Sequence, residues 1–398
     1  MEQFLNIFQH KITAINRLSF KKDTSLNFPI KMIRKKDWLS TIYLLFLLML
    51  PCACANKTTV ETKKEAATTS HTSLQPTKQP FLKYTSGIRS ILHDSKGNYW
   101  FGSHGEGVCL FDGKTYQYFT VADGLSHNQV RTIQEDQQGH IWFGTGYGIS
   151  SYDGEKITNH TPENPFLVAA KPVPQKWTIN EHDLWFNAGN EAGVYKYDGR
   201  KLNFLAFPIP NQPVSGNPYG VTGFSKGQPN KIWISTYSAL FGYDGKSFDI
   251  IDNARLGFTE ATGFLHIRSV LADSKGNVWI GNNGIGVLLN DGKSITNFSK
   301  ENGLLGFFKP TKNTLALPET LEHVFAIGED RHGNIWFGDR DTGAWKYDGN
   351  SMKHYSIDKG LATPHIWQIY EDQTGALLFA MGDGGVYQFN GESFDRRF

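Results

Sequence analysis

A motif that recurs seven times between residues 81 and 398 constrains the fold more than any other feature of the sequence. In its clearest copy, residues 130–154, an Asp-x-x-Gly turn precedes a tryptophan, and the copy ends in Tyr-Asp-Gly. The tryptophan slot holds Trp100, Trp142, Trp185, Trp233, Trp279, Trp336 and, in the seventh copy, Leu378. The closing glycines are Gly113, Gly154, Gly199, Gly245, Gly292, Gly349 and Gly391. Self-similarity at this period indicates a repeat architecture.

Each copy is predicted to form four short strands. The Asp-x-x-Gly turn joins the first strand to the second, and the Asp-Gly pair supplies the positive φ of a hairpin between the third and the fourth. One such sheet cannot bury both faces, whereas copies packed around a ring bury them and protect most edges. We therefore expect residues 81–398 to form an all-β, single seven-bladed β-propeller of four-stranded blades. The tryptophans should fill the spaces between blades.

Charge and composition narrow the function. With 40 basic and 38 acidic residues the net charge is +2, which lacks the basic excess typical of nucleic-acid binding. Motifs for a serine hydrolase, a phosphate loop or a zinc protease are absent from the sequence. Cys109, the one cysteine within the repeats, is expected to be a small buried residue. The prediction is a non-enzymatic protein without a cofactor and without a nucleic-acid partner.

The N-terminus is predicted to be an export signal. Basic residues 34–36 precede a short apolar stretch, residues 42–50, which then reaches two cysteines. We assign residues 1–54 to a lipoprotein signal with Cys54 as the lipidation site, or alternatively Cys52, and Met32 as a possible true start. A single membrane-spanning anchor remains the alternative. Residues 55–80 lack large apolar side chains and are expected to be a disordered tether. The expected location is the bacterial cell envelope, periplasmic or outer surface, with membrane contact only through the lipid anchor.

The stretch from Glu135 to Thr145, with its Asp-x-x-Gly turn and Ile-Trp-Phe-Gly-Thr sequence, resembles the two-component regulator propeller repeat. The Asp-Gly-Leu-Ser-His-Asn stretch at 123–128 does so too. The resemblance implies a periplasmic sensor propeller, in a family often linked to carbohydrate perception. The chain has one propeller and no kinase or DNA-binding sequence after it. We therefore expect a monomeric binding module for a small polar ligand, a saccharide first, or for a protein partner in the envelope.

Equivalent positions in neighbouring blades suggest where a ligand binds. His266, His323 and His365 each precede the repeat aspartate position by seven residues, and Gln129 has the same place in the second blade. A second equivalent position, two residues further along the same strand, is occupied by Arg89, Arg131 and Arg268 in their respective blades. The expected ligand-binding set at the channel mouth is Gln129, His266, His323, His365, Arg89, Arg131, Arg268, Tyr147, Tyr237 and Trp367.

Two alternatives remain open for these side chains. The histidines could instead be polar rim residues that bond the next blade, and the arginines could pair with the repeat's own aspartates. A second resemblance, to streptogramin lyases through the Gly-x-Ile-Trp-Phe repeat, implies an alternative function. In that case the protein would be a metal-dependent lyase that uses His266, His323 and His365.

Overall fold

The computed structural model describes residues 81–161, 174–209, 217–227, 230–306 and 319–398. The chain divides into two compact units, Met1–Leu74 and Gln75–Phe398, and all described residues belong to the second. The predicted signal with Met32, Cys52 and Cys54, and the predicted tether, lie outside the described residues and stay predictions. No helix among the described residues is long and apolar enough to cross a membrane.

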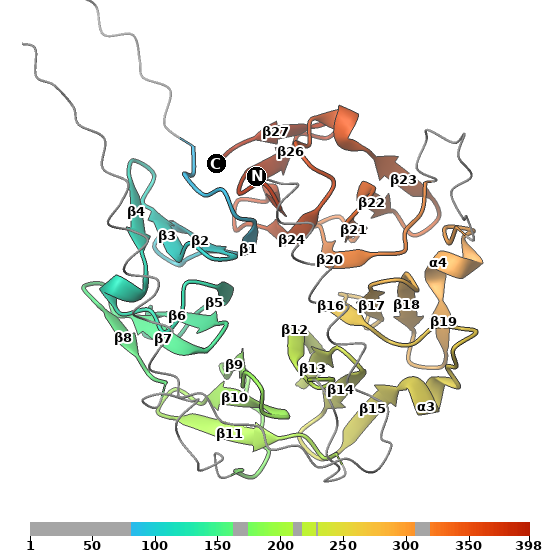
Figure 1. The fold of residues 1–398 in the computed structure, drawn as a ribbon, viewed down its shortest axis with the longest axis horizontal. Coiled ribbons are helices and arrows are strands. Elements are labelled where there is room, and N and C mark those ends of the chain that lie inside the picture. Colours follow the sequence, from blue (N-terminus) through green and yellow to red (C-terminus); the bar gives the residue numbers. More distant parts are fainter. Residues whose placement is uncertain (1–80, 162–173, 210–216, 228–229, 307–318) are drawn as a thin grey trace, which may run out of the picture. The chain divides into compact units, whose positions relative to one another are not determined.

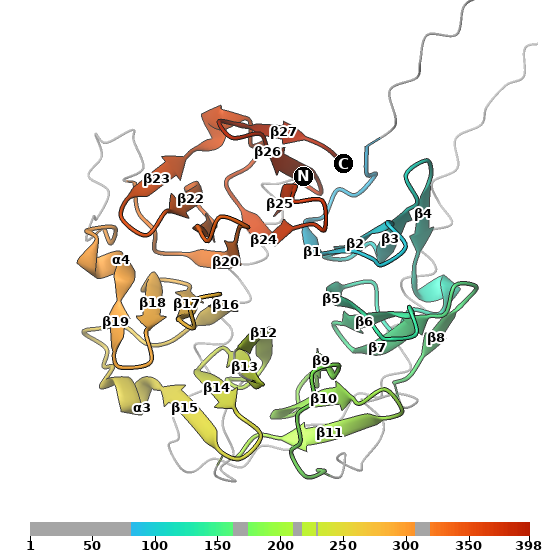
Figure 2. The same ribbon diagram turned by 180° about the vertical axis from the view of Figure 1, so that it is seen from behind.

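The described residues form seven antiparallel sheets that are arranged as blades around a central axis (Figures 1 and 2). In each sheet the strands follow one another in chain order, with the first strand nearest the axis. The expected all-β, seven-bladed propeller is therefore confirmed. Six sheets have four strands, and the third has three within the described residues.

The blades are numbered here in chain order. Blades 1 to 3 contain β1 (Ile88–His93), β2 (Tyr99–Ser103), β3 (Val108–Phe111), β4 (Tyr116–Phe119); β5 (Val130–Glu135), β6 (Ile141–Thr145), β7 (Gly148–Tyr152), β8 (Ile157–Asn159); and β9 (Leu184–Asn187), β10 (Gly193–Tyr197), β11 (Leu202–Ala206). Blades 4 and 5 contain β12 (Val221–Gly227), β13 (Lys231–Thr236), β14 (Ala239–Tyr243), β15 (Phe248–Asp252); and β16 (Ile267–Ala272), β17 (Val278–Asn282), β18 (Val287–Asn290), β19 (Ile295–Asn297). Blades 6 and 7 contain β20 (Val324–Glu329), β21 (Ile335–Asp339), β22 (Gly343–Tyr347), β23 (Met352–Tyr355); and β24 (Ile366–Glu371), β25 (Leu377–Met381), β26 (Val386–Phe389), β27 (Phe394–Arg396). Short helices lie in the connections: η1 (Val121–Asp123), α3 (Asn253–Leu256), α4 (Phe298–Glu301) and η2 (Ile357–Lys359).

The repeat aspartate and tryptophan are joined by a buried hydrogen bond. In blade 5, the Trp279 indole Nε1–H donates to Asp273 Oδ2 at 2.9 Å. The other Asp273 oxygen accepts the backbone N–H groups of Lys275 and Asn277, which closes the turn between the first two strands. The same indole bond occurs in blades 1, 2 and 6. The aspartate therefore fixes both the turn and the orientation of the tryptophan.

Four of these tryptophans, in blades 1, 2, 5 and 6, pack against a phenylalanine of the following blade. Trp100 lies 5.7 Å from Phe143 between ring centroids, and Trp336 lies 5.5 Å from Phe379. Both tryptophans are 1% exposed. The structure thus confirms that these side chains are core residues. Cys109 is also buried, as the sequence predicted.

The ring closes between blade 7 and blade 1 through side chains. Gln368 Oε1 accepts the Ile91 N–H at 2.6 Å, and Tyr370 Oη accepts the His93 N–H at 3.0 Å. Phe398 is buried against the aromatic residues of blade 1. All four strands of blade 7 come from consecutive residues, and residues 81–85 form no strand. Closure therefore uses the same kind of interblade bonding that Ser225 makes to Ala272 between blades 4 and 5.

Blade 3 departs from the repeat because its expected first strand lies elsewhere. The spacing from Val130 to Trp142 places the matching segment just before Trp185, at about residues 174–180. The Gln175 N–H instead donates to Phe204 O at 2.8 Å, and the Trp177 indole donates to Ala206 O at 2.7 Å, along the outer strand β11. Consequently β9 is the strand of blade 3 nearest the axis among the described residues.

We predict that Asp273→Ala destabilises the propeller strongly. The change leaves the buried Trp279 indole N–H and two turn N–H groups without their acceptor, which should lower the free energy of unfolding by about 3 kcal/mol. Asp291→Ala is the matched control, because Asp291 accepts turn N–H groups in the exposed hairpin of the same blade. Urea unfolding of both variants measures the difference. Equal losses would contradict a central role for the buried bond.

Candidate functional site

A β-bulge occurs at one equivalent position in six of the innermost strands. In β1, Ile88 pairs with Ser103 and Ser90 pairs with Gly102, so Arg89 has no residue opposite it. The same register shift occurs in β5, β12, β16, β20 and β24. A bulge leaves one extra residue outside the ladder and turns its side chain in a new direction. The six bulged residues, called the bulge ring below, are Arg89, Arg131, Thr222, Arg268, Phe325 and Trp367.

The bulge ring lines a single cavity of about 320 Å³, called the channel cavity below. All six side chains are half-buried, whereas the residue before each of them is buried in the blade. The remaining described residues of the lining are His104, Gln129, Thr132, Asn187, Val221, Gly223, Phe224 and Tyr237. Six blades therefore each contribute one bulged side chain to the channel cavity.

A neighbouring cavity of about 450 Å³ adds Tyr147 and two asparagines, Asn190 and Asn217. It shares five lining residues with the channel cavity: Gln129, Arg131, Asn187, Val221 and Tyr237. Between blades 2 and 3, the Gln134 side-chain amide donates to Trp185 O at 2.8 Å and accepts from Trp185 N at 3.3 Å. This amide bonds the inner edge of β9, where a first strand would otherwise pair. Arg131, Gln134 and Trp185 together line part of a cavity at this edge.

Three arginines, Arg89, Arg131 and Arg268, called the arginine triad below, carry positive charge into the channel cavity. None of the described lining residues is Asp or Glu, and no triad member forms an ion pair within the described part of the chain. Burial, followed by the charges of Arg131 and Arg268, lowers the pKa of Arg89 to about 9. Burial also lowers the pKa of Arg268. The alternative that these arginines pair with the repeat aspartates is therefore wrong, because those aspartates bind the turns and the indoles.

Aromatic rings hold two members of the triad. The Arg89 guanidinium carbon lies 4.1 Å from the centroid of the Trp367 ring, and that of Arg268 lies 4.3 Å from the Phe325 ring. Stacking of this kind fixes the plane of a guanidinium group while its N–H edge can still donate hydrogen bonds.

A chain of hydrogen bonds links two members of the triad, Arg89 and Arg131. Arg89 Nη1 donates to His104 Nδ1 at 3.1 Å, the Gln129 amide donates to the same atom at 3.3 Å, and Arg131 Nε donates to Gln129 Oε1 at 2.8 Å. Since arginine only donates, His104 Nδ1 must be the unprotonated ring nitrogen. Burial, followed by the charges of Arg89 and Arg131, lowers the pKa of His104, in agreement with a neutral ring.

The three histidines predicted for the mouth are held apart from one another. His266 Nδ1 lies 3.3 Å from the Asn283 amide, and His323 Nδ1 lies 3.0 Å from an Asp341 oxygen. His365 stacks on Trp367 with ring centroids 4.2 Å apart. No group of three His, Cys, Asp or Glu side chains among the described residues is placed to hold a metal ion. The histidines flank the bulge ring and do not converge into it.

The structure brings some of the predicted residues together, whereas their role stays a prediction. The structure brings Gln129, Arg89, Arg131, Arg268, Tyr237 and Trp367 together around the channel cavity, and it places Tyr147 in the adjoining one. Thr222 and Phe325 also line the channel cavity, which was not predicted from the sequence. They occupy the same repeat position as the arginines, so the spacing carried the necessary signal.

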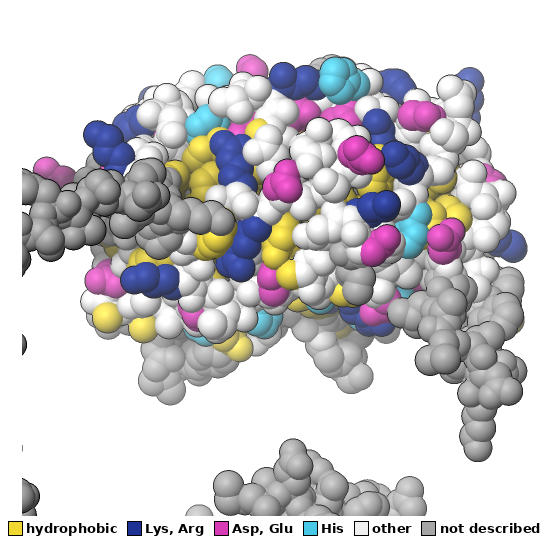
Figure 3. Space-filling view, turned by 90° about the horizontal axis from the view of Figure 1, so that it is seen from above, with side chains coloured by type: hydrophobic (Ala, Val, Ile, Leu, Met, Phe, Trp, Pro, Cys, Tyr) yellow, Lys and Arg dark blue, Asp and Glu magenta, His cyan; other side chains and the backbone are white. Residues whose placement is uncertain are grey.

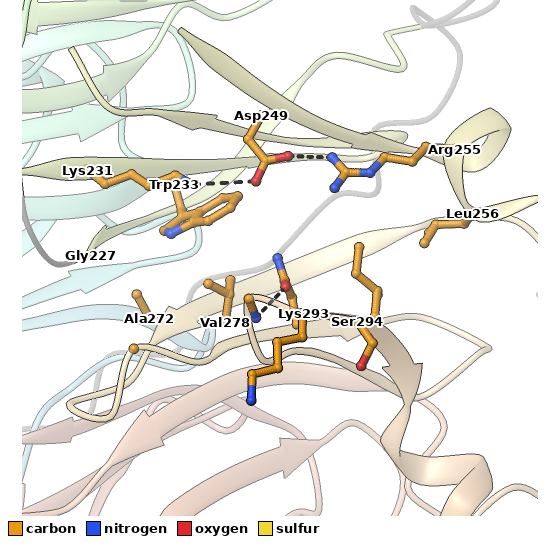
Figure 4. Close-up of a pocket in the computed structure, with 14 residues that line it drawn as sticks. Gly227, Lys231, Trp233, Asp249, Arg255, Leu256, Ala272, Val278, Lys293 and Ser294 are labelled. Atoms are coloured by element: carbon orange, nitrogen blue, oxygen red, sulfur yellow. Dashed lines mark hydrogen bonds and ion pairs between the residues drawn. The ribbon is translucent and has the colours of Figure 1, made fainter. Parts of the chain in front are cut away.

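A larger groove of about 550 Å³ lies between blades 4 and 5, away from the axis (Figure 4). The one carboxylate among its described lining residues is already paired: Asp249 accepts from Lys231 and from Arg255, as the dashed lines show. Lys231 also lies 3.9 Å from the centroid of the Trp233 ring. This groove therefore offers less unsatisfied charge than the channel cavity.

Comparison with known proteins supports the repeat assignment. Residues 124–147 match the family described as two component regulator propeller. The chain carries this propeller repeat. No curated protein sequence matches the chain significantly.

Solved structures share the fold of this propeller. Two are named as extracellular domains of hybrid two component systems of B. thetaiotaomicron; each is 22% identical with a TM-score of 0.56. The chain covers 39% of the length of each, while 80% and 77% of the chain is aligned. Virginiamycin B lyase from Staphylococcus aureus is 17% identical with a TM-score of 0.55, over 78% of this chain and 97% of that one. At these identities the likeness establishes the fold alone.

Gly87 should be required for the position of Trp367. A Cβ atom at Gly87 would lie 2.6 Å from Trp367 Nε1, so Gly87→Ala must displace the indole that supports Arg89. We expect the free energy of unfolding to fall by about 1–3 kcal/mol. Gly105→Ala, in the same blade, is the matched control because nothing lies within 4 Å of its Cβ position. Urea unfolding followed by tryptophan fluorescence compares the two, and equal stability would contradict the close contact.

Acid should destabilise the propeller partly through His365. Burial lowers its pKa to about 4, helped by the charge of Arg340 and opposed by Asp341. The unfolded chain, with a histidine pKa of about 6.5, takes up the proton first. The contribution to stability is therefore complete above pH 6.5 and is lost as the pH falls toward 4.

The check is urea unfolding at pH 7 and pH 4.5. His365→Gln should lose less stability between these pH values than the wild type, whereas the exposed control His182→Gln should behave like the wild type. An unchanged acid sensitivity in His365→Gln would count against the buried neutral ring.

Proposed function

We propose that this regulator propeller is a non-catalytic binding module of a sensor type, which binds a small polar ligand, a saccharide first, in the channel cavity. The observation that carries the proposal is the bulge ring, in which six blades each direct one side chain into a common space. Pockets that combine aromatic rings with a few convergent polar groups are the usual form of a small-molecule site. The named extracellular domains of two component systems support the same role by their fold.

The proposed setting is the bacterial cell envelope, with a lipid anchor at Cys54 or Cys52 as the only membrane attachment. A protein partner remains the other occupant to test. The lyase alternative has less support, because it needs His266, His323 and His365 to share a metal, and no such group occurs in the described part of the chain. The likeness to virginiamycin B lyase concerns the fold.

A thermal-shift screen of the full chain against oligosaccharides tests the proposal. A ligand at one hundred times its Kd should add about 2.7 kcal/mol of stability, which raises the melting midpoint by several degrees. The shift should disappear in Trp367→Ala, which alters the channel cavity. It should persist in Lys231→Ala, which alters the groove between blades 4 and 5.

Three other outcomes would contradict a saccharide site in the channel cavity. A shift that persists in Trp367→Ala and disappears in Lys231→Ala would move the site to the groove. A shift that requires zinc and is lost in His323→Ala would favour the lyase. The absence of any saccharide-dependent shift would contradict the small-ligand proposal and favour a protein partner.

A further inference from the structure

The arginine triad is not required by the propeller repeat. The same bulged position is occupied by Thr222 in blade 4, Phe325 in blade 6 and Trp367 in blade 7, and the register shift is the same in all of these strands. A neutral side chain at this position is therefore compatible with the blade. The arginines of blades 1, 2 and 5 must be explained by something other than sheet geometry.

The triad is also electrostatically unfavourable in the unliganded protein. Arg131 and Arg268 both lower the pKa of Arg89, which shows that the three charges act on one another through a partly desolvated space. Bringing like charges together and away from water raises the free energy unless an opposite charge joins them. Among the described residues of the lining, no carboxylate supplies that charge.

Outside the channel cavity, one face of the molecule follows a different pattern. On the face shown in Figure 3, basic and acidic side chains are interspersed rather than separated. In the groove between blades 4 and 5, Asp249 pairs with two basic residues (Figure 4). The uncompensated arginines are therefore a local feature of the channel cavity.

We propose that the arginine triad binds a carboxylate or sulfate group of the channel ligand, so that the ligand is an acidic saccharide. This inference rests on the proposed function. A guanidinium group offers two parallel N–H donors that match the two oxygens of a carboxylate or sulfate. Stacking on Trp367 and Phe325 holds Arg89 and Arg268 in fixed planes before the ligand arrives. Thr222, Gln129 and Asn187 add polar groups to the same lining.

Calorimetric titration of the full chain with paired probes tests this inference. The acidic members are uronate oligosaccharides and sulfated oligosaccharides, and each has a neutral partner of the same backbone, the methyl ester or the desulfated form. We expect each bound acidic probe to have a Kd at least tenfold lower than its neutral partner. Raising the salt concentration from 50 to 500 mM should weaken the acidic probe and leave the neutral one nearly unchanged.

Variants locate the effect. Arg131→Gln should weaken the acidic probe at least tenfold and leave the neutral partner within about twofold. Arg131→Lys should recover only part of the loss, because it restores the charge without the paired donors. Arg200→Gln, at an exposed turn position between β10 and β11, is the matched control and should bind as the wild type does. The wild-type comparison of acidic and neutral probes stands by itself should Arg131→Gln fail to fold.

The measurements distinguish a failure of the triad assignment from a failure of the proposed saccharide-binding function. If neutral probes bind as tightly as their acidic partners, or if Arg131→Gln and Arg200→Gln behave alike, the assignment of the triad is overturned and the saccharide-binding function survives. If neither acidic nor neutral saccharides bind, both the assignment and the proposed function are overturned.

Discussion

The buried hydrogen bond between a tryptophan indole and the aspartate six residues before it is the interaction on which four of the seven blades depend. The aspartate is almost fully buried, so its charge is tolerated only because the turn N–H groups and the indole surround it. By fixing the indole, the bond sets the side of the sheet that meets the next blade. The tryptophan–phenylalanine contacts between blades follow from this orientation, and the position of each innermost strand around the axis follows from those contacts.

Much of this arrangement could be predicted from the sequence, because the repeat specifies turn chemistry and core residues in the same few positions. The displaced segment of blade 3 could not. Its spacing to Trp185 matches the other copies, but Trp177 finds a more extensive aromatic environment near Tyr243 and Phe248 of blade 4 than a place beside the axis would provide. Sequence spacing specifies which residues are near one another along the chain, whereas tertiary packing decided where this segment lies.

The lining of the channel cavity was also predicted only in part, because strand geometry departs from the regular pattern. In a regular strand His266 and Arg268 would face the same side, so the sequence placed both at the mouth. The bulge interrupts the alternation of side chains and directs Arg268 into the channel cavity, while His266 bonds Asn283 beside it. Bulges have no strong sequence signature, and the arrangement became visible only from the strand register.

The bulge ring has a consequence for how such a protein can diversify. Because each bulged residue lies outside the hydrogen-bonded ladder, a substitution there leaves the pairing of its strand intact, as the present mixture of Arg, Thr, Phe and Trp illustrates. The fold thus separates the positions that maintain it from the positions that face the axis. Three single-residue changes, at Arg89, Arg131 and Arg268, are enough to make the bulge ring neutral without new backbone structure.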